Sequence, residues 1–285
     1  MVAVASYLII VVVALALAGL LLGAVEFGYR RGMRMQPDES LASHATAWEA
    51  ALLGLLALLI GFTFAMAVAR FDRRRDLILD EANAIESTAL RAGYIDRPVR
   101  DRVEDLLRPY VDARIRSYHA GIDMKQTLAL YEEGEVLQRQ IWEQVQSLVR
   151  AHPDSESAVA FMQAADDLIT AEARRRAALD NHVPLPVFAV LVLVAAVGMV
   201  ATGNSCGLHR KRLALGMVLM PLLIVLVVVM VFDIDYPRAG LIRAGQGPML
   251  RLQHELLVQC SSRGACLTTT SPGDQDFQLT RPRPP

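Results

Sequence analysis

The 285-residue chain has almost no net charge, and it lacks the common catalytic motifs. Its formal charge is −1, and its basic residues form no stripe interleaved with aromatic side chains, which argues against nucleic-acid binding. None of the six histidines lies in a Glu-x-x-His or His-Glu-x-x-His pattern, and phosphate-loop, Gly-x-Ser-x-Gly and Cys-x-x-Cys motifs are missing. We therefore predict no enzyme, no metal site and no cofactor.

Cysteine is also scarce, with Cys206, Cys260 and Cys266 as the three examples. An odd number of cysteines cannot form a complete set of internal disulfides. Cys260 and Cys266 would close a small loop if the C-terminus faces an oxidising space, whereas three unpaired thiols is the slightly favoured alternative.

Charge is missing altogether from four long apolar stretches, which are Val2–Val25, Ala50–Ala69, Leu185–Ala201 and Leu213–Phe232. Hydrophobic residues make up 53% of the chain and its mean hydropathy is +0.32. Each stretch has about the length that a helix needs to cross a hydrocarbon core of roughly 30 Å, and in lipid such a segment satisfies its backbone polar groups as a helix. We predict membrane helices over residues 1–25, 49–69, 184–202 and 213–232, and the lipid bilayer as the chain's surroundings.

The remaining segments are polar. We predict a polar linker over residues 26–48, a soluble helical bundle over 70–183, a short loop over 203–212, an amphipathic interfacial segment over 233–258 and a disordered tail over 259–285. The apolar residues of the bundle recur at helical spacing. Its helices are separated by turn and capping signals at Asp96–Pro98, Gly121–Asp123 and His152–Ser155. The expected fold class is an all-α membrane protein with a helical bundle inserted between the second and third of four transmembrane helices.

Basic residues near the helix ends bear on the orientation of the chain. With four crossings, the bundle and both termini share one side, which has nine such residues against six on the other. The positive-inside rule then favours a cytoplasmic bundle in the cell's inner (plasma) membrane. The lack of basic residues before the first helix, and the Cys260/Cys266 pair, favour the reverse.

The second membrane helix is the most informative one. Small residues recur along it every three or four positions, so they share one face of the helix. Close helix packing is the more ordinary use of such a face, and a wall where several subunits surround an axis is the functional alternative. Aromatic residues near this face could form a ring that gates a pore by dewetting. The candidate pore-facing or helix-packing residues are Ala50, Gly54, Ala57, Gly61, Phe62, Phe64, Ala65 and Ala69.

The exit of that helix is rich in charge. Arg70, Arg73, Arg74 and Arg75 are candidates for concentrating anions at a pore mouth, and a solvated, salt-bridged helix is the plainer explanation. Glu81 and Asn83 lie between apolar residues. We predict that they are partly buried and that they pair with a basic partner in Arg174–Arg176.

The run Ala65–Ser87, together with residues 232–240, Arg30-Arg31 and His182–Pro184, resembles the bestrophin-like domain family of multi-pass bacterial membrane proteins. The resemblance covers most of residues 1–252. Bestrophins are pentameric anion channels with four membrane helices per subunit. The resemblance therefore implies a homo-oligomer, a pentamer if the analogy holds, that passes chloride or another small inorganic anion.

Two functional hypotheses follow from these features. The first is an oligomeric anion channel of the bestrophin-like type. The alternative is a membrane-anchored sensor or scaffold whose helical bundle binds a ligand or a partner protein. The oligomeric state separates them, because a ring with an axial opening favours the channel.

Overall fold

The computed structural model describes residues 2–35, 39–121, 123–210, 214–236, 242 and 245–262. All regular elements in this part of the chain are α-helices. They are α1 (Val2–Met33), α2 (Glu39–Ala92), α3 (Val99–His119), α4 (Met124–Ala151), α5 (Glu156–Asp180), α6 (Leu185–Leu208), α7 (Ala214–Asp235) and α8 (Gly247–Ser262).

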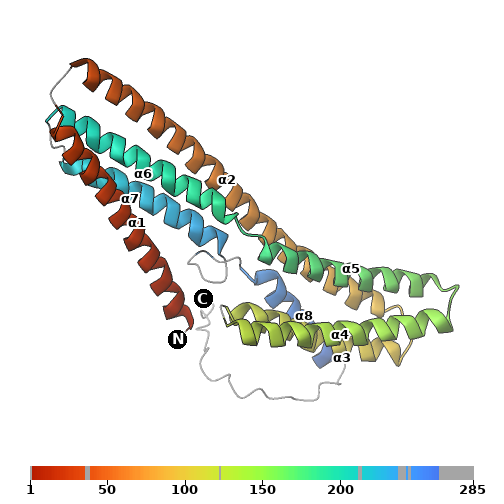
Figure 1. Cartoon of the computed structure of the whole chain (residues 1–285). Helices are drawn as coiled ribbons and strands as arrows, with labels where there is room; N and C mark the ends of the chain where they lie inside the picture. The colour runs from red at the N-terminus through yellow and green to blue at the C-terminus, as the bar shows by residue number, and fades with distance from the viewer. Residues whose placement is uncertain are drawn as a thin grey trace, which may run out of the picture.

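The molecule is elongated, and α2 runs along most of its length (Figure 1). Its 54 residues span about 80 Å at 1.5 Å per residue, more than twice the thickness of a hydrocarbon core. The first half of α2 lies beside α6 and α7, and its second half lies beside α5 (Figure 1). A single unbroken helix therefore joins the two ends of the molecule.

The membrane part consists of α1, α6, α7 and the first half of α2. Four helices of the described chain are long and apolar enough to cross a membrane, and each overlaps one of the four predicted stretches. Their shared core includes Leu21, Leu56, Leu191 and Met199, all nearly or fully buried. The chain is thus an all-α membrane protein, as predicted.

The second half of α2 forms a bundle with α3, α4 and α5. Asp123 caps α4 by accepting a hydrogen bond from the backbone N–H of Gln126, and Ser155 caps α5 by accepting one from Ala158. Leu107 and Tyr110 of α3, which follow the helical spacing of apolar residues, are fully buried. Leu128 and Val159, two apolar residues that share the helical spacing of the bundle, are instead exposed.

Several helices extend further than predicted. The charged end of α1 reaches Met33, α2 begins ten residues before Glu49, and α6 continues to Leu208, so parts of the expected linker and loop are helical. The C-terminal amphipathic segment also differs from expectation. Met249, Leu252 and Leu256 of α8 lie in the core of the bundle and not in a membrane interface. The predicted tail beyond residue 262, and the Cys260–Cys266 pairing, lie outside the described residues.

Candidate functional site

The two sides of α2 differ sharply within the membrane part. Leu56, Thr63 and Ala67 on one side are buried against the other membrane helices. On the opposite side, a Cβ built at Gly54 or Gly61 would have no atom of the chain within 4 Å. All six small residues of the predicted stripe are exposed: Ala50, Gly54, Ala57, Gly61, Ala65 and Ala69. We call these six residues the bare face of α2.

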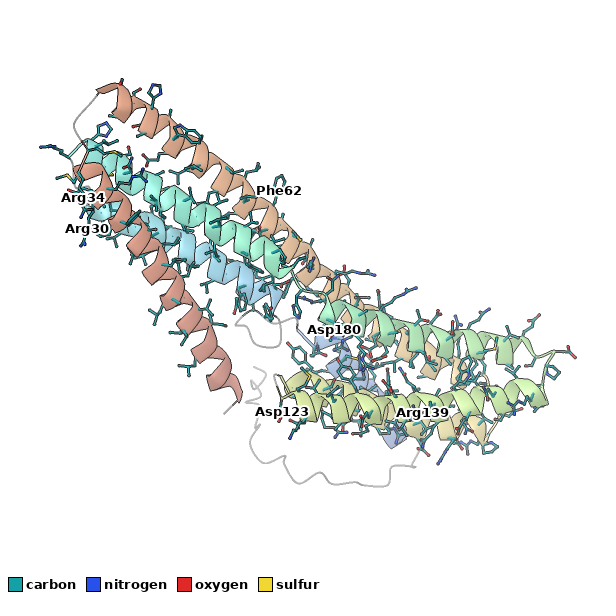
Figure 2. All side chains as sticks on the ribbon, in the orientation of Figure 1. Arg30, Arg34, Phe62, Asp123, Arg139 and Asp180 are labelled. Atoms are coloured by element: carbon teal, nitrogen blue, oxygen red, sulfur yellow. The ribbon has the colours of Figure 1, made fainter. Side chains whose placement is uncertain are left out.

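The two phenylalanines nominated beside this stripe lie in different surroundings. Phe62 is 64% exposed and lies on the side of α2 that faces away from α6 (Figure 2). Phe64 is half-buried and packs with Phe71 and Phe188 in a small cluster around Ala67. Only Phe62 is therefore available to a neighbouring molecule or to a pore.

The arginines at the exit of α2 also divide into two kinds. Arg73 and Arg75 are exposed, and Arg70 is half-buried and donates a hydrogen bond to the side chain of Asn181 at 3.1 Å. Arg74 is buried, which contradicts the expectation that it lies at a pore mouth. The exposed side of α2 also carries the acidic residues Asp72, Asp76 and Asp80 at this level.

Arg74 instead joins the bundle to the membrane helices. Its guanidinium donates to the carbonyl oxygens of Ala178 (3.1 Å), Asn181 (2.8 Å) and Asp235 (3.0 Å). These carbonyls lie at the C-terminal ends of α5 and α7, where backbone acceptors lack helical partners and the helix dipole is negative. The Asp235 carboxylate completes the joint by accepting a hydrogen bond from the backbone N–H of Val183 at 2.9 Å, just before α6. Arg74 thus connects α2 to the C-terminal ends of α5 and α7, and the Asp235 carboxylate extends the joint to the start of α6.

A second group of charges is buried inside the bundle. Glu81 is fully buried and accepts hydrogen bonds from Arg114 at 2.6 Å and from Arg175, one of the three arginines that the sequence nominated. Arg114 also pairs with Glu172 at 3.2 Å. Asn83 is exposed, so the expectation of a buried polar residue there is wrong. The helix turns Glu81 inward and Asn83 outward, because two residues along a helix differ by about 200°.

Electrostatics fix the charge state of this group. Burial alone would raise the pKa of Glu81, but Arg114 and Arg175 hold the pKa of that carboxyl below its ordinary value. Burial would likewise lower the pKa of Arg114, and the Glu81 carboxylate raises it above the ordinary range instead. Burial raises the pKa of Glu172, with Arg114 opposing the rise. The buried set therefore holds Glu81 and Arg114 as a charged pair, a structural use of charge within the bundle.

The family model of the bestrophin-like domain matches residues 13–249. The chain belongs to the bestrophin-like family. Solved structures agree on the fold: two variants of a bacterial bestrophin homologue from Klebsiella pneumoniae superpose with TM-scores of 0.61 and 0.62 at 12% and 13% identity. The matches cover 87% and 88% of this chain and 97% and 99% of those chains. A further structure, of a membrane protein, gives a TM-score of 0.64 at 12% identity over 88% of this chain and 98% of that one.

No curated protein matches this bestrophin-like chain. At such low identity the solved structures establish the shared fold alone. The bare face, the joint at Arg74 and the buried pair at Glu81 are features of this chain's own residues.

Sequence reasoning missed two features of the structure. Arg114 was not nominated from the sequence, yet it donates a hydrogen bond to Glu81 at 2.6 Å. Gly28 and Gly32 of α1 were assigned to a linker, and Gly203 and Gly207 of α6 to a loop, yet all four lie where the two helices touch. The signal in the sequence was the Gly-xxx-Gly spacing in each segment, which is typical of close helix contacts in membranes.

Proposed function

We propose that the chain assembles as a homo-oligomer with the bare face of α2 turned toward neighbouring copies, and that the assembly conducts small inorganic anions. The pentameric, anion-conducting assembly of bestrophins is what family membership implies for this chain. Bestrophins are channels and not enzymes, which agrees with the lack of catalytic motifs in the sequence.

The exposed small residues of α2 are the observation that carries this proposal. In a membrane, helices associate through small residues that let backbones approach closely, since lipid offers no hydrophobic gain for burying larger ones. The other side of α2 uses large residues such as Leu56 to pack within the chain. A face of six small residues along the whole apolar stretch fits contact with a second copy better than contact with lipid.

Phe62 is the residue best placed to control conduction. It adjoins the bare face, and its ring has no neighbours that bury it within the chain. In a closed ring of subunits, one Phe62 from each copy would narrow the axis to a hydrophobic constriction that excludes water and ions. At the exit, Arg70, Arg73 and Arg75 would then meet anions, while Asp72, Asp76 and Asp80 moderate the field.

Chloride flux from liposomes containing the purified protein tests the proposal. Phe62→Ala widens the constriction, so we expect it to increase chloride efflux several-fold over the wild type. Leu226→Ala is the matched control, because Leu226 is 63% exposed on α7 and is expected to leave the flux unchanged.

Absence of chloride flux from both the wild type and Phe62→Ala, with folded protein in the liposomes, would refute anion conduction. Potassium flux without chloride flux would also refute anion conduction. It would mean that the acidic residues, and not the arginines, determine which ions pass the exit of α2.

We further propose that the chain resides in the inner (plasma) membrane with its bundle in the cytoplasm. The positive-inside count supports this orientation. A reporter that is active only in the cytoplasm is expected to be active when it is fused after Pro285. Activity of a reporter that works only outside the cytoplasm would reverse the assignment.

A further inference from the structure

The ends of α1 and α6 that lie farthest from the bundle are held together by glycine. A Cβ at Gly28 would collide with the backbone of Val200, and one at Gly207 would collide with the backbones of Tyr29 and Gly32. The two helices therefore touch backbone to backbone over their last turns, as Gly-xxx-Gly pairs permit. Charged residues at the two C-terminal ends must consequently lie close together.

Those ends carry four exposed arginines, Arg30, Arg31 and Arg34 on α1 and Arg210 just after α6. Figure 2 shows Arg30 and Arg34 at this end of the membrane part. Within the described residues, only Arg30 of the four has an ion-pair partner, Glu26 at 2.7 Å. We call Arg30, Arg31, Arg34 and Arg210 the basic end. Arg74, Arg114 and Arg175, by contrast, are buried in internal contacts.

Arg210 occupies a backbone position that normally favours glycine. Its φ is 49°, in the left-handed region, and its N–H bonds to the Gly207 carbonyl at the end of α6. Helices commonly end with glycine in this conformation, because a side chain there is strained by about 1 kcal/mol or more. The arginine at this position tolerates a strained backbone conformation and places a positive charge at the basic end.

One face of α1 combines this charge with exposed apolar side chains. Leu20, Phe27, Arg31 and Arg34 are spaced by seven, four and three residues, so they follow one side of the helix. Phe27 is 61% exposed within the chain. The apolar residues lie within the membrane-spanning length and the arginines lie at its edge, which is the order of acyl chain and headgroup in a phospholipid.

We infer that the basic end binds the headgroup of an anionic phospholipid, whose acyl chain lies along Leu20 and Phe27. Arginine suits this role because its planar guanidinium binds phosphate oxygens in pairs. Basic residues at a membrane surface attract anionic lipid additively. The inference does not depend on conduction by the oligomer, since it uses neither the bare face nor Phe62.

Native mass spectrometry of the full chain in detergent, titrated with phosphatidylglycerol or phosphatidylcholine, tests the inference. We expect the wild type to bind phosphatidylglycerol more tightly than phosphatidylcholine. Arg31→Gln should weaken phosphatidylglycerol binding about fivefold and the double variant Arg31→Gln/Arg34→Gln about 25-fold. The matched control is Arg139→Gln, an exposed arginine on α4 in the bundle (Figure 2), which should leave binding unchanged.

Arg210→Gly keeps the test informative if the other variants fold poorly, because glycine relaxes the backbone at this position. This variant should melt at or above the wild-type temperature and still lose about fivefold in phosphatidylglycerol affinity. Equal binding of the two lipids by the wild type, or equal losses in Arg31→Gln and Arg139→Gln, would overturn the inference. So would full displacement of the lipid by an equal concentration of glycerol phosphate, since the site would then recognise a free phosphate.

Discussion

Glu81 and its arginine partners show how this chain accommodates charge in an apolar interior. A buried carboxylate is costly unless it is paired and hydrogen-bonded. Glu81 meets that condition through Arg114 and Arg175, with the Tyr110 hydroxyl 3.4 Å away as a further donor. Its pair with Arg114 joins α2 to α3, and its pair with Arg175 joins α2 to α5, so one residue holds three helices of the bundle in register.

We predict that Glu81→Gln destabilises the bundle by about 3–5 kcal/mol, because two buried arginines lose their main counter-charge. The pKa of Glu81 is lowered from 4.5, so its stabilising effect is complete above pH 4.5 and is lost as the pH falls through the folded-state pKa. The Glu172 carboxylate lowers the stability of the folded state above pH 4.5, because the pKa of Glu172 is raised in the folded state. Melting temperatures of the detergent-solubilised protein between about pH 3 and pH 7 measure both effects.

Glu86→Gln is the matched control for this prediction, since Glu86 lies on the exposed side of the same helix. It should change stability by less than about 0.5 kcal/mol. If Glu81→Gln melts like the wild type at neutral pH, the buried pair does not stabilise the bundle as described.

At the scale of single elements, α1 and α6 approach each other backbone to backbone at their glycines. A Cβ at Gly203 would collide with the backbone of Val25, whereas one at Gly216 on α7 would meet nothing within 4 Å. We predict that Gly203→Ala lowers stability by about 1–3 kcal/mol, because the two backbones must separate to admit the methyl group.

Thermal unfolding of the two variants in the same detergent compares them directly. Gly216→Ala should match the wild type or exceed it slightly, since alanine favours a helix more than glycine does. If both variants lose the same amount of thermal stability, the close contact of α1 and α6 does not require glycine at position 203.

The helices of this chain could be predicted largely from the sequence, because each depends on local patterns. The four charge-free stretches mark the membrane helices, and Asp123 and Ser155 mark the starts of α4 and α5. The helix ends near Gly28 and Gly203 were predicted wrongly, because glycine near arginine is typical of a turn in a soluble protein. In a membrane protein, glycines spaced by four residues are typical of a close contact between helices. The partner of Glu81 could not be predicted fully, because Arg114 is distant in sequence and many exposed arginines compete with it.

At the scale of the whole molecule, the bare face of α2 is available for assembly. We predict that Gly61→Leu leaves the fold of the single chain intact, because nothing in the chain lies near that position, and that it weakens the oligomer by at least tenfold in dissociation constant. Light scattering after gel filtration in detergent measures the mass of the protein component.

Gly216→Leu provides the control, because position 216 is exposed on α7 and is equally free of neighbours. It should leave the oligomer unchanged. An unaltered mass for Gly61→Leu, or a monomeric wild type, would show that α2 does not mediate assembly.

Electron cryo-microscopy of the full chain in lipid nanodiscs tests the central claim most directly. The account predicts a closed ring of identical subunits in which α2 is the innermost helix, with Gly54 and Gly61 against a neighbouring copy and Phe62 at the narrowest point of the axis. A monomer, or an assembly in which the bare face of α2 contacts lipid, would contradict it.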